Sequence, residues 1–372
     1  TFNFKREWPP FQPSDLRLNL DDNRGSIWSS HGTIAGLPGD RTSVEFTIAA
    51  TEKKFSIATN SRGTLPQIKM AMAELPPLEF ARPIFQDITV DGSSEAKLEM
   101  SFDINDLPRS LDLEVATAFQ NSVLASNLLN LTATEVSGQL VFDSANGFQS
   151  DLITGLVFDT PVMAKIGPDL TTTLAPLAAA EINFLASVEA IKDWQGIDQA
   201  LPFAGATPVT ISVLVNENVS VEIDSDLVGV EIEMPGTWGK KENLQAPIQL
   251  RWDSADAPQW DIFWFRRASA LIQNRYKQRI SGLIDLTPRA EPIGWKHKKL
   301  DPGLTIVGAI PLLNIPEWGT FLSRFKGSSL SSKVFQPHFS KLKLQKLIWG
   351  NSDLGSAEVE FDFSLNEPQG SF

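Results

Sequence analysis

Residues 96–104 read Ala-Lys-Leu-Glu-Met-Ser-Phe-Asp-Ile, and residues 111–119 read Leu-Asp-Leu-Glu-Val-Ala-Thr-Ala-Phe. Apolar and polar side chains alternate along both stretches. Because successive side chains of a β-strand point to opposite faces, this pattern predicts two strands that each have one apolar face. Residues 105–108, Asn-Asp-Leu-Pro, supply turn chemistry between them. We therefore expect a β-hairpin over residues 96–119.

The same alternation recurs along the rest of the chain at short intervals. Spacings of about 8 to 12 residues predict about sixteen to twenty strands in an all-β, mainly antiparallel fold. Two stretches with helical spacing, residues 188–195 and 315–325, predict short helices. The clearest further alternating stretches are 44–48 followed by 55–57, 140–142 followed by 152–158, 219–223 followed by 228–232, and 342–347 followed by 359–365.

The chain of 372 residues is long enough for two or three domains, but its 24 Gly and 24 Pro do not gather into a linker. We therefore expect one continuous β-segment over residues 1–372. The longest uncharged run, residues 115–134, contains too many polar side chains for a transmembrane helix. The first residue is Thr1, with no basic and apolar leader after it, so we expect a piece of a longer protein.

Charge and motif content disfavour several classes of function. A formal net charge of −13 repels a phosphate backbone, so we expect no nucleic-acid partner. There is no cysteine, and the three histidines, at positions 31, 297 and 338, lack the spacing of a zinc hydrolase. No Gly-x-Ser-x-Gly motif occurs. We expect no enzyme, no metal and no cofactor; a glycan-cleaving carboxylate pair such as Asp224 with Asp226 is the weakest alternative.

The question that decides the function is what covers the apolar side of so many strands. One hypothesis is a lipid conduit, in which acyl chains complete a face that protein covers incompletely. The other is a structural or adaptor protein, in which sheet packs on sheet and contacts with protein partners carry the function. Residues 260–265, apolar on both strand faces, fit a doubly buried strand or a patch for an apolar ligand. The candidate lining residues are Leu98, Met100, Phe102, Ile104, Leu113, Val115, Leu140, Phe142, Val221, Ile223, Val230, Ile232, Val359, Phe361 and Phe363.

Several segments resemble one family. Residues 226–240 (DLVGVEIEMPGTWGK) resemble the strand and Pro-x-x-x-Gly-Lys loop of the large AsmA-like proteins of the YhdP type. Residues 136–142 (VSGQLVF) are similar to a second strand of that family, and residues 303–318 to a strand that leads into a helix. Residues 342–355 resemble the strand that closes this unit. Residues 1–135 match the family in general style, and residues 136–372 carry the motifs.

The resemblance implies a fold, a function and a location. The fold would be an elongated, curved β-sheet that encloses an apolar groove, as in bridge-like lipid transfer proteins. The function would be intermembrane phospholipid transport across the periplasm toward the outer membrane, by a protein anchored in the inner membrane. Phospholipid in the groove and the two membranes, reached through segments outside this chain, would be its partners, with envelope proteins as further candidates. A helix at 315–325 is a candidate gate or cap through Trp318, Phe321, Leu322 and Phe325.

Overall fold

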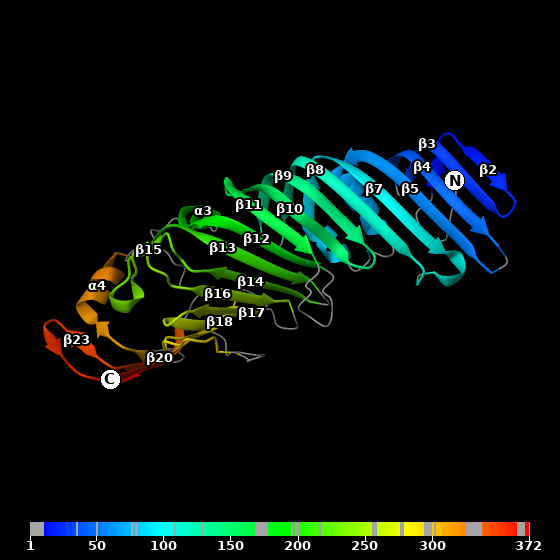
Figure 1. The fold of residues 1–372 in the computed structure, drawn as a ribbon. Coiled ribbons are helices and arrows are strands. Elements are labelled where there is room, and N and C mark those ends of the chain that lie inside the picture. The colour runs from blue at the N-terminus through cyan, green and yellow to red at the C-terminus, as the bar shows by residue number, and fades with distance from the viewer. Residues whose placement is uncertain are drawn as a thin grey trace. The chain divides into compact units, whose positions relative to one another are not determined.

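The computed structural model forms two compact units, residues 1–182 and residues 183–372 (Figure 1). The described helices include none that is both long and apolar enough to cross a membrane. The predicted all-β, mainly antiparallel class with a few short helices is confirmed. The structure describes residues 11–34, 36–49, 51–75, 78, 81–107, 109–127, 130–167, 178–194, 196–197, 201–215, 218–254, 259–275, 279–293, 300, 303–324, 337–362 and 369–371.

The first unit is built on an antiparallel meander. Each long strand from β3 to β5 and from β7 to β11 pairs with the next one in this series, and the short strands β1 and β2 both pair with β3. Strand β6 pairs with the end of β8. The bounds are β1 Phe11–Pro13, β2 Arg17–Asp21, β3 Arg24–Ile34, β4 Leu37–Ile48, β5 Lys53–Thr64, β6 Ile88–Asp91, β7 Ser93–Asp103, β8 Asp112–Ser126, β9 Leu131–Asp143, β10 Gly147–Val157 and β11 Thr160–Gly167.

The hairpin predicted over residues 96–119 is confirmed. Leu98 lies opposite Val115 and Met100 lies opposite Leu113 in the pairing of β7 with β8. The alternation ends one residue earlier than expected, because the Asp103 carboxylate accepts a hydrogen bond of 2.8 Å from the Asn105 N–H and caps a short 3-10 turn, η2, at Ile104–Asp106. Ile104 is therefore exposed and lies outside the strand.

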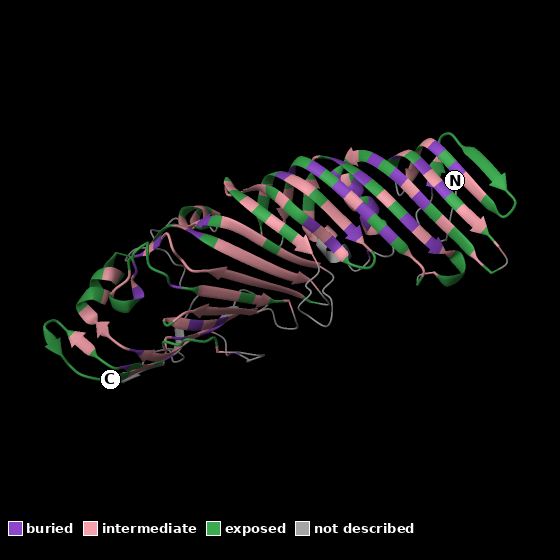
Figure 2. Ribbon diagram, viewed as in Figure 1, coloured by how far each residue is buried: buried purple, intermediate pink, exposed green. Residues whose placement is uncertain are grey.

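An excursion between β5 and β7 covers the apolar face of this unit. It contains helix α1, Leu65–Glu74, and helix α2, Arg82–Asp87. Thr64 begins α1 with a capping box, in which its hydroxyl accepts from the Gln67 N–H and the Gln67 side chain accepts from the Thr64 N–H at 2.9 Å. Figure 2 shows the result on the strands of this unit, where buried and exposed residues alternate.

The second unit extends an antiparallel series and then changes direction. Strand β13 pairs with β14, followed in order by β16, β17, β18 and β19; the pairs β19–β20 and β20–β22 are parallel, and β25 and β26 follow antiparallel. The short strand β15 pairs with the start of β13. The bounds are β13 Phe203–Val215, β14 Val219–Ser225, β15 Val230–Ile232, β16 Ile248–Asp253, β17 Gln259–Trp264, β18 Ala268–Arg275, β19 Arg279–Asp285, β20 Gly303–Ile310, β22 Pro337–Leu344, β25 Ala357–Asp362 and β26 Gln369–Ser371.

Helices α3, Val188–Trp194, and α4, Ile315–Ser323, lie where the spacing predicts helices. Residues 195 and 325, at the ends of the two predicted stretches, lie outside the described residues. Strand β12, Ala178–Ser187, contains the boundary between the units, and η3, Gly236–Trp238, is a 3-10 turn. A small separate sheet beside α4 contains β21 Leu313–Asn314, β23 Leu347–Trp349 and β24 Ser352–Asp353.

The connection between the parallel strands β19 and β20 depends on Asp285. Its carboxylate accepts hydrogen bonds from the Thr287 N–H at 2.9 Å and the Arg289 guanidinium at 3.0 Å. Burial would raise the pKa of Asp285, but these hydrogen bonds outweigh it and hold the pKa below the ordinary 3.8. The ionised carboxylate thus fixes the turn that starts the crossover.

We predict that Asp285→Asn lowers the free energy of unfolding by about 1–2 kcal/mol at pH 7, because a charge-assisted hydrogen bond is lost. A carboxyl group with a lowered folded-state pKa stabilises the fold above its unfolded pKa, and loses that effect as the pH falls through the folded value. The difference between the two proteins should therefore shrink below about pH 4. Urea denaturation at pH 7 and pH 3 measures it.

Asp353→Asn is the control, because Asp353 is an exposed residue at the end of β24 whose ion pair with Lys346 contributes little to stability. It should leave the denaturation midpoint nearly unchanged at both pH values. An equal effect of both substitutions would contradict the role assigned to Asp285.

Candidate functional site

The apolar strip of the first unit is closed by the protein itself. Buried residues recur along the strands of this unit in Figure 2, and among them Leu113 is completely inaccessible. They pack against Ile68 and Met72 of α1 and against Leu78 in the excursion that follows. Five of the predicted lining residues are buried here, namely Met100, Phe102, Leu113, Val115 and Phe142, and Leu98 and Leu140 are half-buried beside them.

Small residues on the sheet make room for α1. Gly39, Ser61, Ala96 and Thr117 lie in register across four neighbouring strands. Short side chains in one row let a helix approach the sheet closely. The cavity between α1 and this row measures about 30 Å³, which is the volume of a single water molecule. A fatty acyl chain therefore has no space in this strip while α1 is docked.

The corresponding apolar face of the second unit has no such cover. We call it the open face, and it consists of two rows of side chains that the strand register places side by side on β13, β14, β16, β17, β18 and β19. Every one of these residues is half-buried, and no described helix packs across β14, β16, β17 or β18. One row is Ile211, Ile223, Leu250, Ile262, Ala270 and Ile284, and the other is Val213, Val221, Trp252, Trp260 and Ile272.

The opposite face of the same strands is polar at β14 and β16. The Gln249 amide donates hydrogen bonds to the carboxylates of Glu222 and Asp224, at 2.5 and 2.9 Å. Arg251 pairs with Glu222 at 3.2 Å. Burial raises the pKa of Asp261 on β17, and the charge of Arg251 lowers it in part. On β14 and β16, the face of the sheet opposite the open face is therefore suited to contact with solvent.

Further along the sheet, the polar face is covered instead. Leu271 on β18 and Leu283 on β19 are buried against Leu300, which lies in the connection to β20. The open face on the reverse side of the same strands stays half-buried, at Ala270 and Ile284. The crossover therefore packs on one side of the sheet and leaves the apolar rows uncovered by described residues.

A rigid loop borders one end of the open face. Trp238 in η3 is buried and packs edge-on against Trp264 of β17, with ring centroids 6.1 Å apart. Arg267 lies over the ring of Trp264 and donates hydrogen bonds to the carbonyls of Trp238 and Gly239, at 2.8 and 3.1 Å. These contacts hold the loop between β15 and β16 in one position.

Lys240 fixes the other side of this loop. Its buried ammonium donates hydrogen bonds to the carbonyls of Val230 and Lys241, and its backbone bridges Ile232. Burial lowers the pKa of Lys240, and the charge of Arg267 lowers it further. A Cβ atom at Gly239 would lie 2.4 Å from the Met234 carbonyl oxygen, so the position requires glycine. The Pro-x-x-x-Gly-Lys motif thus has a structural role in this chain.

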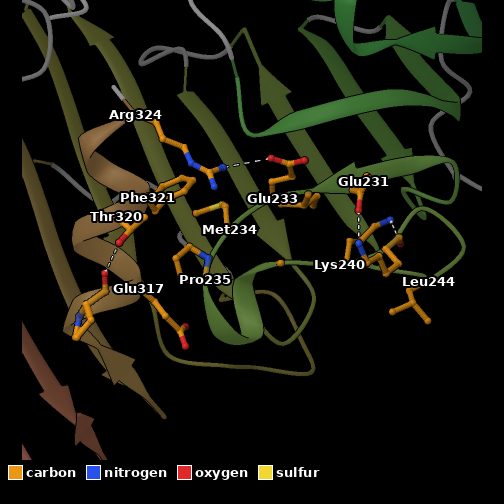
Figure 3. Close-up of a pocket in the computed structure, with 14 residues that line it drawn as sticks. Glu231, Glu233, Met234, Pro235, Lys240, Leu244, Glu317, Thr320, Phe321 and Arg324 are labelled. Atoms are coloured by element: carbon orange, nitrogen blue, oxygen red, sulfur yellow. Dashed lines mark hydrogen bonds and ion pairs between the residues drawn. The ribbon is translucent and has the colours of Figure 1, made fainter. Parts of the chain in front are cut away.

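Helix α4 and this loop enclose a pocket of about 880 Å³ (Figure 3). Phe321 and Met234 line it from the two walls, and Arg324 on α4 pairs with Glu233 on the loop at 3.4 Å. Trp318 packs edge-on against Phe321 at 5.6 Å, whereas Leu322 is exposed. Of the candidate gate residues, Phe321 faces the pocket; Phe325 lies outside the described residues.

The other predicted lining residues fall into four groups. Val221 and Ile223 belong to the open face. Val230 and Ile232 are buried where β15 pairs with the start of β13, away from the two rows. Val359 is half-buried on β25. Nothing is described of the Phe361 side chain, and Phe363 lies outside the described residues.

Residues 260–265 were expected to form a doubly buried strand or an apolar patch. The structure favours the patch, because every residue of β17 is half-buried rather than buried. The sequence pattern did not single out Trp238, Arg267 and Trp264 as a unit, because aromatic and cationic partners far apart in sequence leave no periodic signal. The loop motif that ends at Lys240 was the available clue.

No cluster of three metal-ligating side chains occurs among the described residues. Asp224 accepts a hydrogen bond from Gln249, and Asp226 accepts one of 2.8 Å from the Val228 N–H at a turn. These two carboxylates therefore have separate hydrogen-bond partners.

Comparison with known proteins gives one match. The sequence model of the family described as YhdP protein matches residues 1–368. No curated protein and no solved structure matches the chain.

We predict that Trp238→Ala destabilises the second unit by about 3–5 kcal/mol, because it removes a buried indole and leaves a cavity beside Trp264. Backbone amides of residues 236–240 should exchange with deuterium faster in this variant. Trp349→Ala is the matched control, since Trp349 is 62% exposed, and it should change the stability by less than about 0.5 kcal/mol. Equal effects would show that the loop is not anchored through Trp238.

Proposed function

Because this chain belongs to the YhdP family, we propose that it carries phospholipid in the bacterial envelope, with acyl chains lying on the open face of the second unit. Family membership supports lipid transport in general. The uncovered apolar rows of the second unit are the observation that carries the specific assignment.

The energetic need for such a face is large. Each methylene group exposed to water costs about 0.8 kcal/mol, so one chain of about 16 carbons costs on the order of 12 kcal/mol. A protein that moves lipid through water must therefore replace the membrane along the whole path. Side chains such as Ile262 and Trp260 provide the apolar contacts that the membrane would otherwise provide. The polar face on the other side of the sheet remains in contact with solvent.

The dimensions of the open face fit an acyl chain. Six strands spaced about 4.8 Å apart extend over about 24 Å, more than the roughly 15 Å of one leaflet of a bilayer hydrocarbon core. The two rows lie side by side, so a tail can lie across the strands and contact side chains along its length. Charged head groups need no buried site, because they can stay in water at the border of the face.

The first unit has a different role in this proposal. Its strip is filled by Ile68, Met72 and Leu78 of the excursion, so lipid contact is confined to the second unit while the excursion is docked. The location that we propose is the periplasm, in a protein anchored in the inner membrane by segments outside this chain. The two membranes are then the source and the destination of the lipid.

The closed strip favours one alternative. A structural or adaptor protein, acting through envelope protein partners, would have dry apolar faces throughout, as the first unit does. The two functions make opposite predictions for the second unit, where the adaptor requires a protein partner on the open face and the conduit requires hydrocarbon.

We predict that photo-crosslinking residues placed at Leu250 or Ile262 form adducts with phospholipid in cells, because both side chains belong to the open face. The same residue at Gln249, which points to the opposite face, should give no lipid adduct. A crosslinker at Met100 should also give none, because α1 covers it. Mass spectrometry of the purified protein reads out all four positions. Adducts at Gln249 equal to those at Ile262 would contradict the proposal.

We also predict that Val221→Asp lowers the rate of phospholipid transfer between vesicles by at least about tenfold, because a carboxylate in contact with hydrocarbon is strongly disfavoured. Ser220→Asp is the matched control. Ser220 is the neighbouring residue on β14 and points to the polar face, so its substitution should leave transfer unchanged. Circular dichroism checks that both variants fold. Equal transfer by the two variants would exclude lipid from this part of the sheet.

A further inference from the structure

The pocket between α4 and the loop of residues 231–244 is a second site, separate from the two rows of the open face. Its volume of about 880 Å³ lies within the range of about 300–1,000 Å³ that is usual for small-molecule sites. Figure 3 shows Phe321, Thr320 and Arg324 on one wall, and Glu233, Met234 and Pro235 on the other.

The loop wall is formed in advance of any ligand. The bridge between Ile232 and Lys240 closes it, and the Lys240 ammonium uses its hydrogen bonds on loop carbonyls beneath the pocket. Arg267 holds the same loop from the sheet side. A wall that is already ordered lowers the entropy that a ligand loses on binding.

The lining combines an apolar part with a rim of both charges. The apolar lining consists of Ile232, Met234, Pro235 and Phe321. The rim carries the acids Glu231, Glu233 and Glu317 and the bases Lys241 and Arg324; with Lys240, the six charged side chains of the lining sum to zero. Such a site opposes a ligand with a net charge and favours one that carries a cation and an anion together beside an apolar part.

We propose that this pocket binds the zwitterionic head group of a phospholipid, with its phosphate at Arg324 and its ammonium at Glu233, the two groups that now pair with each other. This inference rests on the proposed function and adds a head-group specificity to it. The apolar lining takes the glycerol end and the first methylene groups of the tails.

The existing ion pairs can be exchanged for ligand contacts. Arg324 and Glu233 are 60% and 66% exposed in their pair, and Lys241 is 79% exposed in its pair with Glu231. Exposed pairs of this kind stabilise a protein by about 0–1 kcal/mol, so a ligand loses little by separating them. A guanidinium gains more from a phosphate, which it contacts through two parallel hydrogen bonds.

The test compares three soluble probes on the 372-residue chain by calorimetry: dihexanoyl-phosphatidylethanolamine below its micelle concentration, dihexanoyl-phosphatidylglycerol, and glycerophosphoethanolamine. We expect the zwitterionic lipid to bind at least about tenfold more tightly than the anionic lipid, a difference of about 1.4 kcal/mol. Equal affinities for the two lipids would overturn the assignment. Binding of glycerophosphoethanolamine as tightly as the lipid would identify a free zwitterion as the ligand and overturn the lipid source.

Substitutions locate the binding. Arg324→Gln and Glu233→Gln should each lower the affinity for the zwitterionic lipid by about tenfold. Their counterparts Lys341→Gln and Glu360→Gln, an exposed pair on β22 and β25, should have no effect. The double exchange Glu233→Arg with Arg324→Glu keeps both charges in the pocket and should retain most of the affinity. If all of these variants, including the two controls, lost binding to the same extent, the lipid would bind elsewhere and the assignment would be wrong. If lipid adducts form at Ile262 but the calorimetric tests show no head-group binding in this pocket, the head-group site is refuted and the transport proposal stands.

Discussion

A strand with one apolar face must have that face covered, and this requirement governs the whole chain. Leu98, Met100 and Phe102 alternate with polar residues on β7, and Val219, Val221 and Ile223 do the same on β14. In the first unit, the excursion through α1 and α2 meets the requirement with protein side chains. In the second unit, no described helix meets the requirement across β14, β16, β17 and β18. In the function that we propose, hydrocarbon from lipid tails meets it in the same way as α1 does, by removing apolar surface from water.

The borders of the open face are as informative as its centre. Trp238, Trp264 and Arg267 hold one border rigid, and the connection anchored by Asp285 packs on the opposite side of the sheet. These segments therefore pack at one end of the sheet and on its opposite face, and they do not cover the two apolar rows. A sheet that needed a dry core would gain stability from the opposite arrangement, with Leu300 placed over Ile262 rather than over Leu283.

The strands and their apolar faces could be predicted from the sequence, because a period of two is a local property. Which apolar face is covered by protein could not be predicted, because Met100 and Ile223 have equivalent neighbours in the sequence and differ in what packs on them in the structure. The excursion that makes the difference inserts between β5 and β7, two strands that pair directly at Thr64 and Ser93. Thr64 and Gln67 form a capping box that is readable in the sequence, and it was the available sign of a helix at this point. Val230 and Ile232 show the same limit, since their alternation is regular but the pairing of β15 buries them.

The central claim is that hydrocarbon touches the open face, and tryptophan fluorescence tests it directly. Trp252 and Trp260 lie on that face with ring centroids 6.4 Å apart, and a variant that keeps these two and replaces the other eight of the ten tryptophans with phenylalanine reports on it alone. Phospholipids with brominated acyl chains quench an indole that is in contact with the chain. The account predicts strong quenching by brominated lipid and none by the same lipid without bromine. Unchanged emission, from a folded variant that retains bound phospholipid, would contradict it.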